Sequence, residues 1–143
     1  MFKIQVRVGI LNRCIEWKKD EIWYEADPRH AEILIRELGL DGKRSVVTPG
    51  IKAKIDEEND THLDPSSATR YRQLIARCNF IAQERPDIQY AVKEAANGMS
   101  SPKKSDWDKL LRIGQYLSGK PRYVIKYVLQ KDVHSINAYG DSD

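Results

Sequence analysis

The sequence predicts an α+β fold: an N-terminal β-hairpin with a short helix, then a three-helix bundle, and then the start of a second β segment. Three observations support this fold class. Apolar residues alternate over residues 11–26, recur at helical spacing over residues 66–119, and form a β-branched and aromatic run over residues 123–129. A chain of 143 residues has room for one domain of ordinary size or for pieces of two.

The first 40 residues are predicted to form the hairpin and a helix packed on it. Alternating apolar residues lie on both sides of a turn signal at residues 18–20. Asp27 then offers a side-chain oxygen as helix N-cap, Pro28 suits the first helical position, and Gly39 can take the left-handed conformation that ends the helix. The predicted apolar face of this helix consists of Ala31, Leu34, Ile35 and Leu38.

Residues 41–65 are predicted to be a linker that is partly ordered at most, because they contain glycines, prolines and an acidic run without a sustained period. Ser66 or Ser67 is then expected to cap the first bundle helix. Its apolar positions keep helical spacing over three turns: Tyr71, Leu74, Ile75, Cys78, Ile81 and Ala82.

Two more helices complete the predicted bundle of residues 66–119. Arg85-Pro86 separates the first helix from the second, since proline disfavours helical geometry in the preceding residue and suits the first position of a new helix. Asn97-Gly98 marks the next end, and the third helix is expected to start at Ser101-Pro102 or one turn later at Ser105. The positions predicted to face inward are Ile88, Ala91, Val92, Ala95 and Met99, then Trp107, Leu110, Leu111, Gly114 and Leu117.

Residues 120–143 are predicted to be an incomplete β segment. Residues 123–129 form one strand, and residues 136–139 form a second that the end of the chain interrupts. With 41% hydrophobic and 31% charged residues, the composition is typical of a folded globular protein. No apolar run approaches the length of a membrane span and no secretory signal is recognisable, so we expect an intracellular protein without a membrane partner.

Charge is unevenly distributed along the chain, although the net charge is only +3. Residues 102–131 contain eight basic and two acidic residues, whereas residues 56–64 contain five acidic residues and no Lys or Arg. These segments are either two solvated surfaces, or a basic segment that follows a phosphate backbone and an acidic loop that stays clear of it. Cys14, Cys78 and the three histidines are scattered and predict neither a disulfide nor a metal site.

In their order and intervals, motifs across nearly all of the chain resemble one region of the Pol polyprotein of copia-type LTR retrotransposons. These motifs are residues 11–13, 27–32, 48–50, 71–72, 83–90, 99–102 and 107, and Arg112 with residues 116–119. In that family the hairpin and first helix follow the polymerase palm, and the bundle is the thumb-to-connection region. A ribonuclease H domain then begins with a strand that ends in an aspartate, so the resemblance implies a ribonuclease H-like start at residues 120–143.

The resemblance implies a parent with RNA-directed DNA polymerase and ribonuclease H activities, of which this chain is a fragment without a complete active site. The segment Tyr139-Gly140-Asp141-Ser142 is close to the polymerase signature Tyr-x-Asp-Asp, but it departs at the last residue and follows the helices. Asp141 matches the first metal-binding carboxylate of the family's ribonuclease H. The parent would need Mg²⁺, but Asp141 and Asp143 alone cannot hold two such ions, so no cofactor is expected in this chain.

The partners implied by the resemblance are an RNA–DNA or DNA duplex and the remainder of the Pol polyprotein. Arg72, Lys109 and Arg112 are the candidates for contacts with the nucleic-acid backbone; alternatively, they lie on the solvated faces of amphipathic helices. Two other functions remain open. The chain could be a stand-alone helical protein-interaction module, or a small Mg²⁺-dependent nuclease that uses Asp141 and Asp143.

Overall fold

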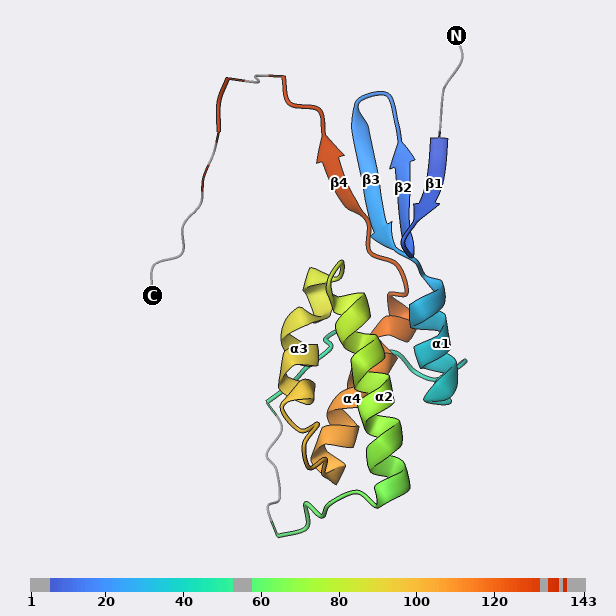
Figure 1. Cartoon of the computed structure of the whole chain (residues 1–143), viewed down its shortest axis with the longest axis vertical. Coiled ribbons are helices and arrows are strands. Elements are labelled where there is room, and N and C mark those ends of the chain that lie inside the picture. Colours follow the sequence, from blue (N-terminus) through green and yellow to red (C-terminus); the bar gives the residue numbers. More distant parts are fainter. Residues whose placement is uncertain (1–5, 53–57, 132–133, 137, 139–143) are drawn as a thin grey trace.

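The computed structural model describes residues 6–52, 58–131, 134–136 and 138, and it confirms the α+β class. A four-stranded antiparallel sheet lies at one end of a bundle of helices (Figure 1). The elements are β1 (Val6–Ile10), β2 (Arg13–Trp17), β3 (Glu21–Ala26), α1 (Arg29–Glu37), α2 (Pro65–Ala82), α3 (Pro86–Ala96), α4 (Lys104–Gly119) and β4 (Ile125–Val128).

The sheet has the strand order β1-β2-β3-β4, and every neighbouring pair is antiparallel. The predicted hairpin is present as β2 and β3, and β1 extends it by one strand that the sequence analysis did not assign. The strand predicted at residues 123–129 is present as β4, but it pairs with β3 and so completes the N-terminal sheet. The second strand predicted near the C-terminal end includes Asn137 and Tyr139, which lie outside the described residues.

A two-residue turn joins β1 to β2. Leu11 and Asn12 have φ values of 50° and 61°, so both central residues are left-handed, as the type I′ turns favoured in hairpins require. Asparagine tolerates this conformation, whereas a leucine side chain is strained in it. The Asn12 carbonyl accepts a hydrogen bond of 3.0 Å from the Asp27 backbone N–H, which fixes the turn against the end of β3.

The helix ends differ in part from the predictions. α2 is capped by Asp64, whose carboxylate accepts the backbone N–H groups of Ser66 and Ser67, so neither serine is the cap. The physical reason is the Asp-Pro pair: Pro65 occupies the first helical turn and the preceding carboxylate faces the free N–H groups. In α1 the N-cap is Pro28 and not the predicted Asp27, and the first helical residue is Arg29 and not Pro28, although the Asp27 carboxylate does accept the Arg29 backbone N–H at 3.0 Å. α4 begins at Lys104, between the two predicted starts.

The apolar core lies between the four helices. α1 was expected to pack on the hairpin, but it packs on α2 and α4, because its apolar face meets theirs. In α4 the inward face is rotated from the prediction, with Ile113 fully buried and Leu111 half-exposed. The side chains buried in the core are Leu34, Ile35, Leu40, Tyr71, Leu74, Ile75, Cys78, Ile81, Ala82, Ile88, Ala91, Val92, Ala95, Leu110, Ile113, Tyr116 and Leu117.

The described part of the predicted linker is ordered against the bundle. Leu40 is buried, and the Val46 backbone N–H donates to the Gln115 carbonyl of α4. At its other end the Leu63 N–H donates to the Pro102 carbonyl at 2.9 Å. This segment therefore covers part of the helices, and its middle, residues 53–57, lies outside the described residues.

Candidate interaction surfaces

The two faces of the sheet differ in chemistry. The strand register places residues that are opposite one another on the same face, so the composition of each face follows from the pairing. One face, which we call the apolar sheet face, carries nine apolar or aromatic side chains, with Arg13 and Ala26 at its end nearest the bundle. The nine are Val6, Val8, Ile10, Ile15, Trp17, Ile22, Tyr24, Ile125 and Tyr127.

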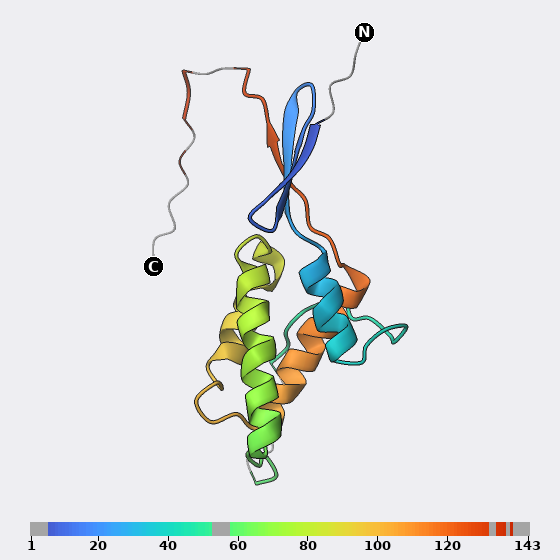
Figure 2. The ribbon, with the colours of Figure 1, turned by 45° about the vertical axis from the view of Figure 1, so that its right-hand side comes forward.

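Five of the nine apolar side chains on this face are exposed, and the other four, Val8, Ile15, Tyr24 and Ile125, are half-buried. The exposed fractions of Trp17, Ile22 and Tyr127 are 39%, 38% and 57%, and none of the nine side chains belongs to the apolar core of the bundle. Figure 2 shows the sheet nearly edge-on, extending away from the bundle without a described helix over either face. The structure thus presents a large apolar surface to solvent.

The opposite face is charged and provides its own partners. Arg122 donates two hydrogen bonds, of 2.9 and 2.7 Å, to the buried Glu25 carboxylate. The ammonium groups of Lys18 and Lys126 lie 3.0 and 4.7 Å from the centre of the Trp23 ring, where cation–π attraction is favourable. Antiparallel sheets commonly have one solvated face and one covered face, and this charged face is suited to water. The apolar sheet face is therefore the one that matches a covering partner.

Charged side chains connect the sheet to the bundle. Arg13 of β2 donates at 2.6 Å from its Nε to the Glu84 carboxylate at the end of α2, and the Tyr24 hydroxyl donates to the same carboxylate oxygen at 3.3 Å. Glu84 is only 5% exposed, so its carboxylate is shielded from water, and the positive charge of Arg13 balances its negative charge. The position of the sheet relative to α2 consequently depends on directional polar contacts more than on apolar packing.

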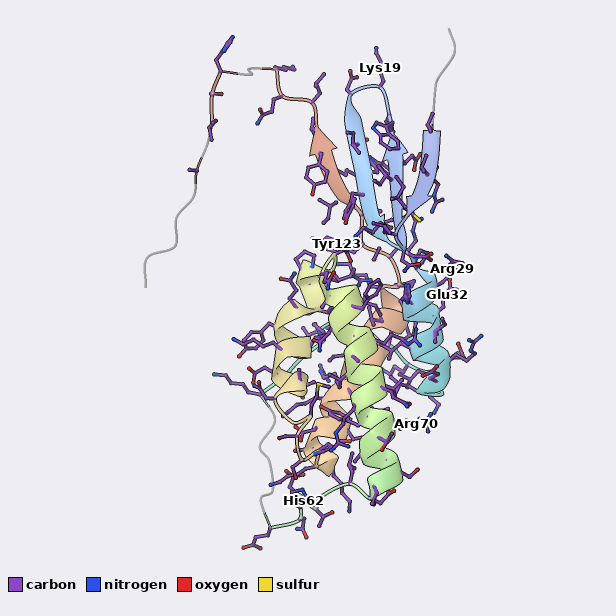
Figure 3. All side chains as sticks on the ribbon, in the orientation of Figure 1. Lys19, Arg29, Glu32, His62, Arg70 and Tyr123 are labelled. Carbon is purple, nitrogen blue, oxygen red and sulfur yellow. The ribbon has the colours of Figure 1, made fainter. Side chains whose placement is uncertain are left out.

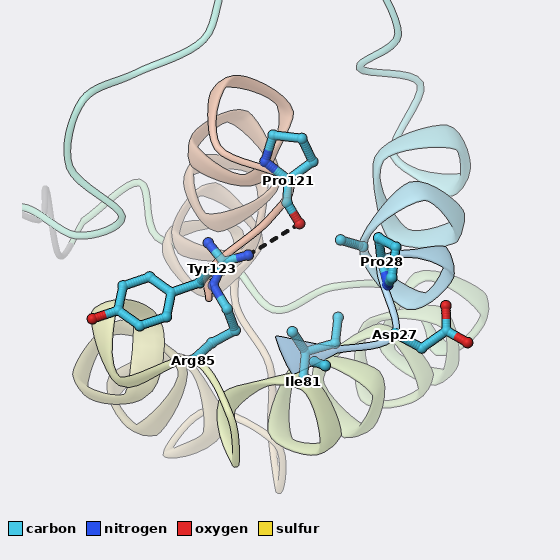
Figure 4. Close-up of a pocket in the computed structure, with 8 residues that line it drawn as sticks. Asp27, Pro28, Ile81, Arg85, Pro121 and Tyr123 are labelled. Atoms are coloured by element: carbon cyan, nitrogen blue, oxygen red, sulfur yellow. Dashed lines mark hydrogen bonds between the residues drawn. The ribbon is translucent and has the colours of Figure 1, made fainter. Parts of the chain in front are cut away.

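A second polar cluster holds the end of α4 against the start of α3. Arg85 is 2% exposed, and its guanidinium donates to both Asp87 oxygens, at 2.9 and 2.8 Å, and to the Lys120 carbonyl at 2.9 Å. It also donates to the Pro121 carbonyl at 3.2 Å, the bond drawn in Figure 4. Burial alone would raise the pKa of Asp87, but the hydrogen bonds and charge of Arg85 outweigh burial and lower it.

The gap beside this cluster is too small for a ligand. Figure 4 shows it between Asp27, Pro28, Ile81, Arg85 and Tyr123. Its volume of about 10 Å³ is close to the room that one water molecule needs. The junction between sheet and bundle is therefore a structural feature.

The three basic residues predicted to contact nucleic acid have partners within the chain. Arg72 donates to the Met99 and Ser100 carbonyls, at 2.8 and 3.2 Å, and so connects α2 to the loop before α4. Lys109 pairs with Asp106 at 2.9 Å. Arg112 donates at 2.9 Å to the Thr48 hydroxyl. The structure does not bring the three together around one pocket, and their role toward nucleic acid stays a prediction.

The acidic run also has a structural role. Asp60 accepts the Ser105 backbone N–H at 2.9 Å and the Ser105 hydroxyl at 2.8 Å, at the N-terminal end of α4. The partial positive charge of that helix end favours a carboxylate there. Since Asp64 caps α2, two of the five acids are helix-end partners. These contacts explain the placement of negative charge without any reference to nucleic acid.

The predicted metal-binding residues, Asp141 and Asp143, lie outside the described residues, so the magnesium-ligand role of Asp141 stays a prediction. Across the described ranges, no three His, Cys, Asp or Glu side chains are grouped so that they could hold a metal ion. Within the same ranges, no helix is both long and apolar enough to span a lipid bilayer.

Comparison with known proteins gives three relatives. The chain is 30% identical over 113 residues to the retrovirus-related Pol polyprotein from transposon RE2 of Arabidopsis thaliana, covering 78% of this chain and 8% of the relative. It is 35% identical over 75 residues to the Pol polyprotein from transposon RE1 of the same plant, covering 52% of this chain and 5% of the relative. An uncharacterized mitochondrial protein of Arabidopsis thaliana is 26% identical over 117 residues, 80% of this chain and 47% of that protein.

No family model and no solved structure matches the chain. The matched region is a small part of each Pol relative and about half of the mitochondrial protein. These relatives confirm the resemblance on which the sequence analysis relied.

Proposed function

We propose that this chain, whose homologues are copia-type Pol polyproteins, is a non-catalytic structural region of such a polyprotein. In this role it corresponds to the thumb-to-connection region between the polymerase palm and the ribonuclease H domain, and it supports the template–primer duplex. The observation that carries the structural part of the proposal is the apolar sheet face, because it is a surface suited to burial against another part of a larger protein.

The size of this surface supports the proposal. If an aromatic side chain offers ~150–250 Å², the exposed fractions of Trp17 and Tyr127 amount to roughly 200 Å². The exposed aliphatic neighbours add a similar area, so the patch is on the order of 400 Å², a size that is often functional on a monomer. The matched region is 8% of the length of the RE2 polyprotein, so other regions of such a polypeptide are the natural covering partner.

A tethered partner fits this patch better than a second copy of the chain. Two copies placed face to face would bury roughly 800 Å² in all, which is less than the ~1,200 Å² of a standard stable interface. A partner within the same polypeptide needs less area, because the connection between them gives a high effective concentration. We therefore expect the isolated chain to be monomeric at micromolar concentration.

The duplex-supporting part of the proposal relies on the resemblance and on the positive charge of residues 102–131. Arg72, Lys109 and Arg112 remain its candidate contacts. Each has donor groups beyond those used within the chain, since a guanidinium carries five N–H donors and an ammonium three. Binding of a labelled RNA–DNA hybrid should weaken steeply with salt, and substitution of Arg112 by Ala should lower the affinity.

The structural part is tested by a matched pair of variants on β4. Tyr127 lies on the apolar sheet face and Val128 on the opposite face, with exposed fractions of 57% and 67%. When the chain is produced together with the flanking Pol regions of its parent element, we expect copurification that Tyr127→Lys abolishes and Val128→Lys preserves. Equal binding by both variants would refute the proposed use of this face.

A stand-alone protein-interaction module predicts instead a salt-insensitive protein partner outside Pol and no nucleic-acid binding. A small nuclease predicts Mg²⁺-dependent cleavage of an RNA–DNA hybrid that disappears in Asp141→Asn. The assays above separate both possibilities from the structural role.

A further inference from the structure

An open groove lies between α1, α2 and the turn that joins β1 to β2. Its lining residues are Asn12, His30, Gln73, Arg77 and Phe80. The groove has a volume of about 290 Å³, at the lower end of the range found for small-ligand sites. It is separate from the apolar sheet face and from the contacts of Arg72, Lys109 and Arg112.

The groove combines an aromatic surface with a cationic group. The rings of His30 and Phe80 have centroids 4.9 Å apart and planes inclined by 56°, so the two rings are in tilted contact and present two differently oriented aromatic surfaces to the groove. Arg77 lies one turn before Phe80 on α2 and is half-buried. Within the described part of the chain its guanidinium has no hydrogen-bond or ion-pair partner. None of the described residues that line the groove is acidic, so an anion entering it meets Arg77 without a competing carboxylate from them.

The wall formed by the turn is fixed and strained. Besides the hydrogen bond from Asp27 to the Asn12 carbonyl, the Arg13 guanidinium donates at 3.3 Å to the Leu11 carbonyl. Leu11 keeps a left-handed conformation although its side chain is 78% exposed and gains little from packing. Strain of this kind persists where the surroundings impose it, and it is concentrated at functional sites. The turn thereby holds the backbone of Asn12, a residue that lines the groove, in a fixed position.

We infer that this groove binds an unpaired nucleotide of a nucleic-acid strand. The base stacks on the Phe80 ring with the tilted His30 ring at its edge, and the Arg77 guanidinium donates to the phosphate. The carboxamides of Asn12 and Gln73 offer both donors and acceptors to the sugar or to the edge of the base. This combination of stacking surface and cation is the one that single-stranded nucleic acid uses in other binding grooves. The inference goes beyond the proposed function, which concerns a duplex.

Fluorescence anisotropy with the whole chain tests the inference. The probes are a labelled 12-nucleotide single strand, a blunt duplex of the same sequence, and an unlabelled mononucleotide as competitor. We expect the single strand to bind more tightly than the duplex at equal salt. Phe80→Leu keeps an apolar side chain but removes the ring, and Arg77→Lys keeps the charge but removes the planar fork. Phe80→Leu should weaken single-strand binding by about tenfold, within the range measured for one stacked base. Arg77→Lys should weaken it by a smaller factor, because the charge is kept and only the bidentate donor geometry is lost.

Lys93→Ala is the matched control, because it removes an exposed cation from α3, away from the groove. It should leave single-strand affinity within twofold, and thermal unfolding should show that all variants are folded. The inference is overturned if the single strand binds no better than the duplex, or if Phe80→Leu and Arg77→Lys bind it like the parent chain. Competition by the mononucleotide at equal affinity would also overturn it, in favour of a free nucleotide. Loss of duplex binding alone would count against the proposed function and leave this inference standing.

Discussion

Substitution of Arg85 by Ala should be one of the most damaging single changes in this protein. The change removes four hydrogen bonds to Asp87 and to the Lys120 and Pro121 carbonyls from a site where the side chain is 2% exposed. Among the described residues, the Asp87 carboxylate would keep the Tyr116 hydroxyl, at 2.9 Å, as its remaining side-chain hydrogen-bond donor. Removal of one member of a buried ion pair costs about 3–5 kcal/mol, because the other charge stays buried and unpaired. For a domain of this size that loss lowers Tm by roughly 10–20 °C.

Thermal and urea unfolding, followed by circular dichroism, measure this effect. Arg29→Ala is the matched control, since Arg29 also pairs with an aspartate two residues away, but its side chain is 75% exposed. It should cause a clearly smaller loss, because the Arg29 guanidinium is solvated and the Asp27 carboxylate keeps the backbone N–H of residue 29, at 3.0 Å, as a donor. The double variant Arg85→Ala/Asp87→Asn should recover part of the stability. If Arg85→Ala lowered Tm no more than Arg29→Ala, the reasoning about the buried cluster would be wrong.

Three further predictions follow from the structure. Leu11→Asn should raise the free energy of unfolding by about 1 kcal/mol in urea titrations, because asparagine tolerates the left-handed conformation of this turn. An unchanged urea midpoint would contradict the strain assigned to Leu11. Burial raises the pKa of the Cys78 thiol to about 12, so a thiol reagent at pH 8 should modify Cys14 first and reach Cys78 only on unfolding. The pKa of Asp87 is lowered in the folded state, so its contribution to stability is present above the unfolded value of ~3.9 and is lost as pH falls through the folded value. The Tm, measured at pH values between 7 and 2, should decrease as the pH falls below ~3.9. The decrease should be less steep in the double variant Arg85→Ala/Asp87→Asn.

The helices could be predicted from local pattern, whereas their partners could not. The spacing of apolar residues and the Arg85-Pro86 break were sufficient to place α2 and α3 close to their observed bounds. The N-cap of α2 was missed by two residues, although Asp64-Pro65 repeats the signal that was used at Asp27-Pro28. The packing of α1 on α4 was not predictable in this way, because an apolar face indicates burial without specifying the covering element.

The sheet and the groove depend on contacts between distant parts of the chain. The register that pairs Tyr24 with Ile125 joins segments that the sequence analysis assigned to different regions, and periodicity carries no signal for such pairing. His30 was grouped with the scattered histidines, because its neighbour Phe80 is 50 positions away. The alternation of residues in β2 and β3 predicted the hairpin, but only the structure shows that one face of the sheet is apolar and that no described helix covers it.

The pairing of β3 with β4 has a consequence for biosynthesis. When β3 has left the ribosome, its outer backbone N–H and C=O groups remain without a strand until residues 125–128 have also been translated. An open strand edge readily adds a strand from another molecule. A premature stop codon between α4 and β4 would therefore release a product with a complete helical bundle and an unpaired sheet edge that can bind strands of other chains. Quality-control proteases would have to remove this product.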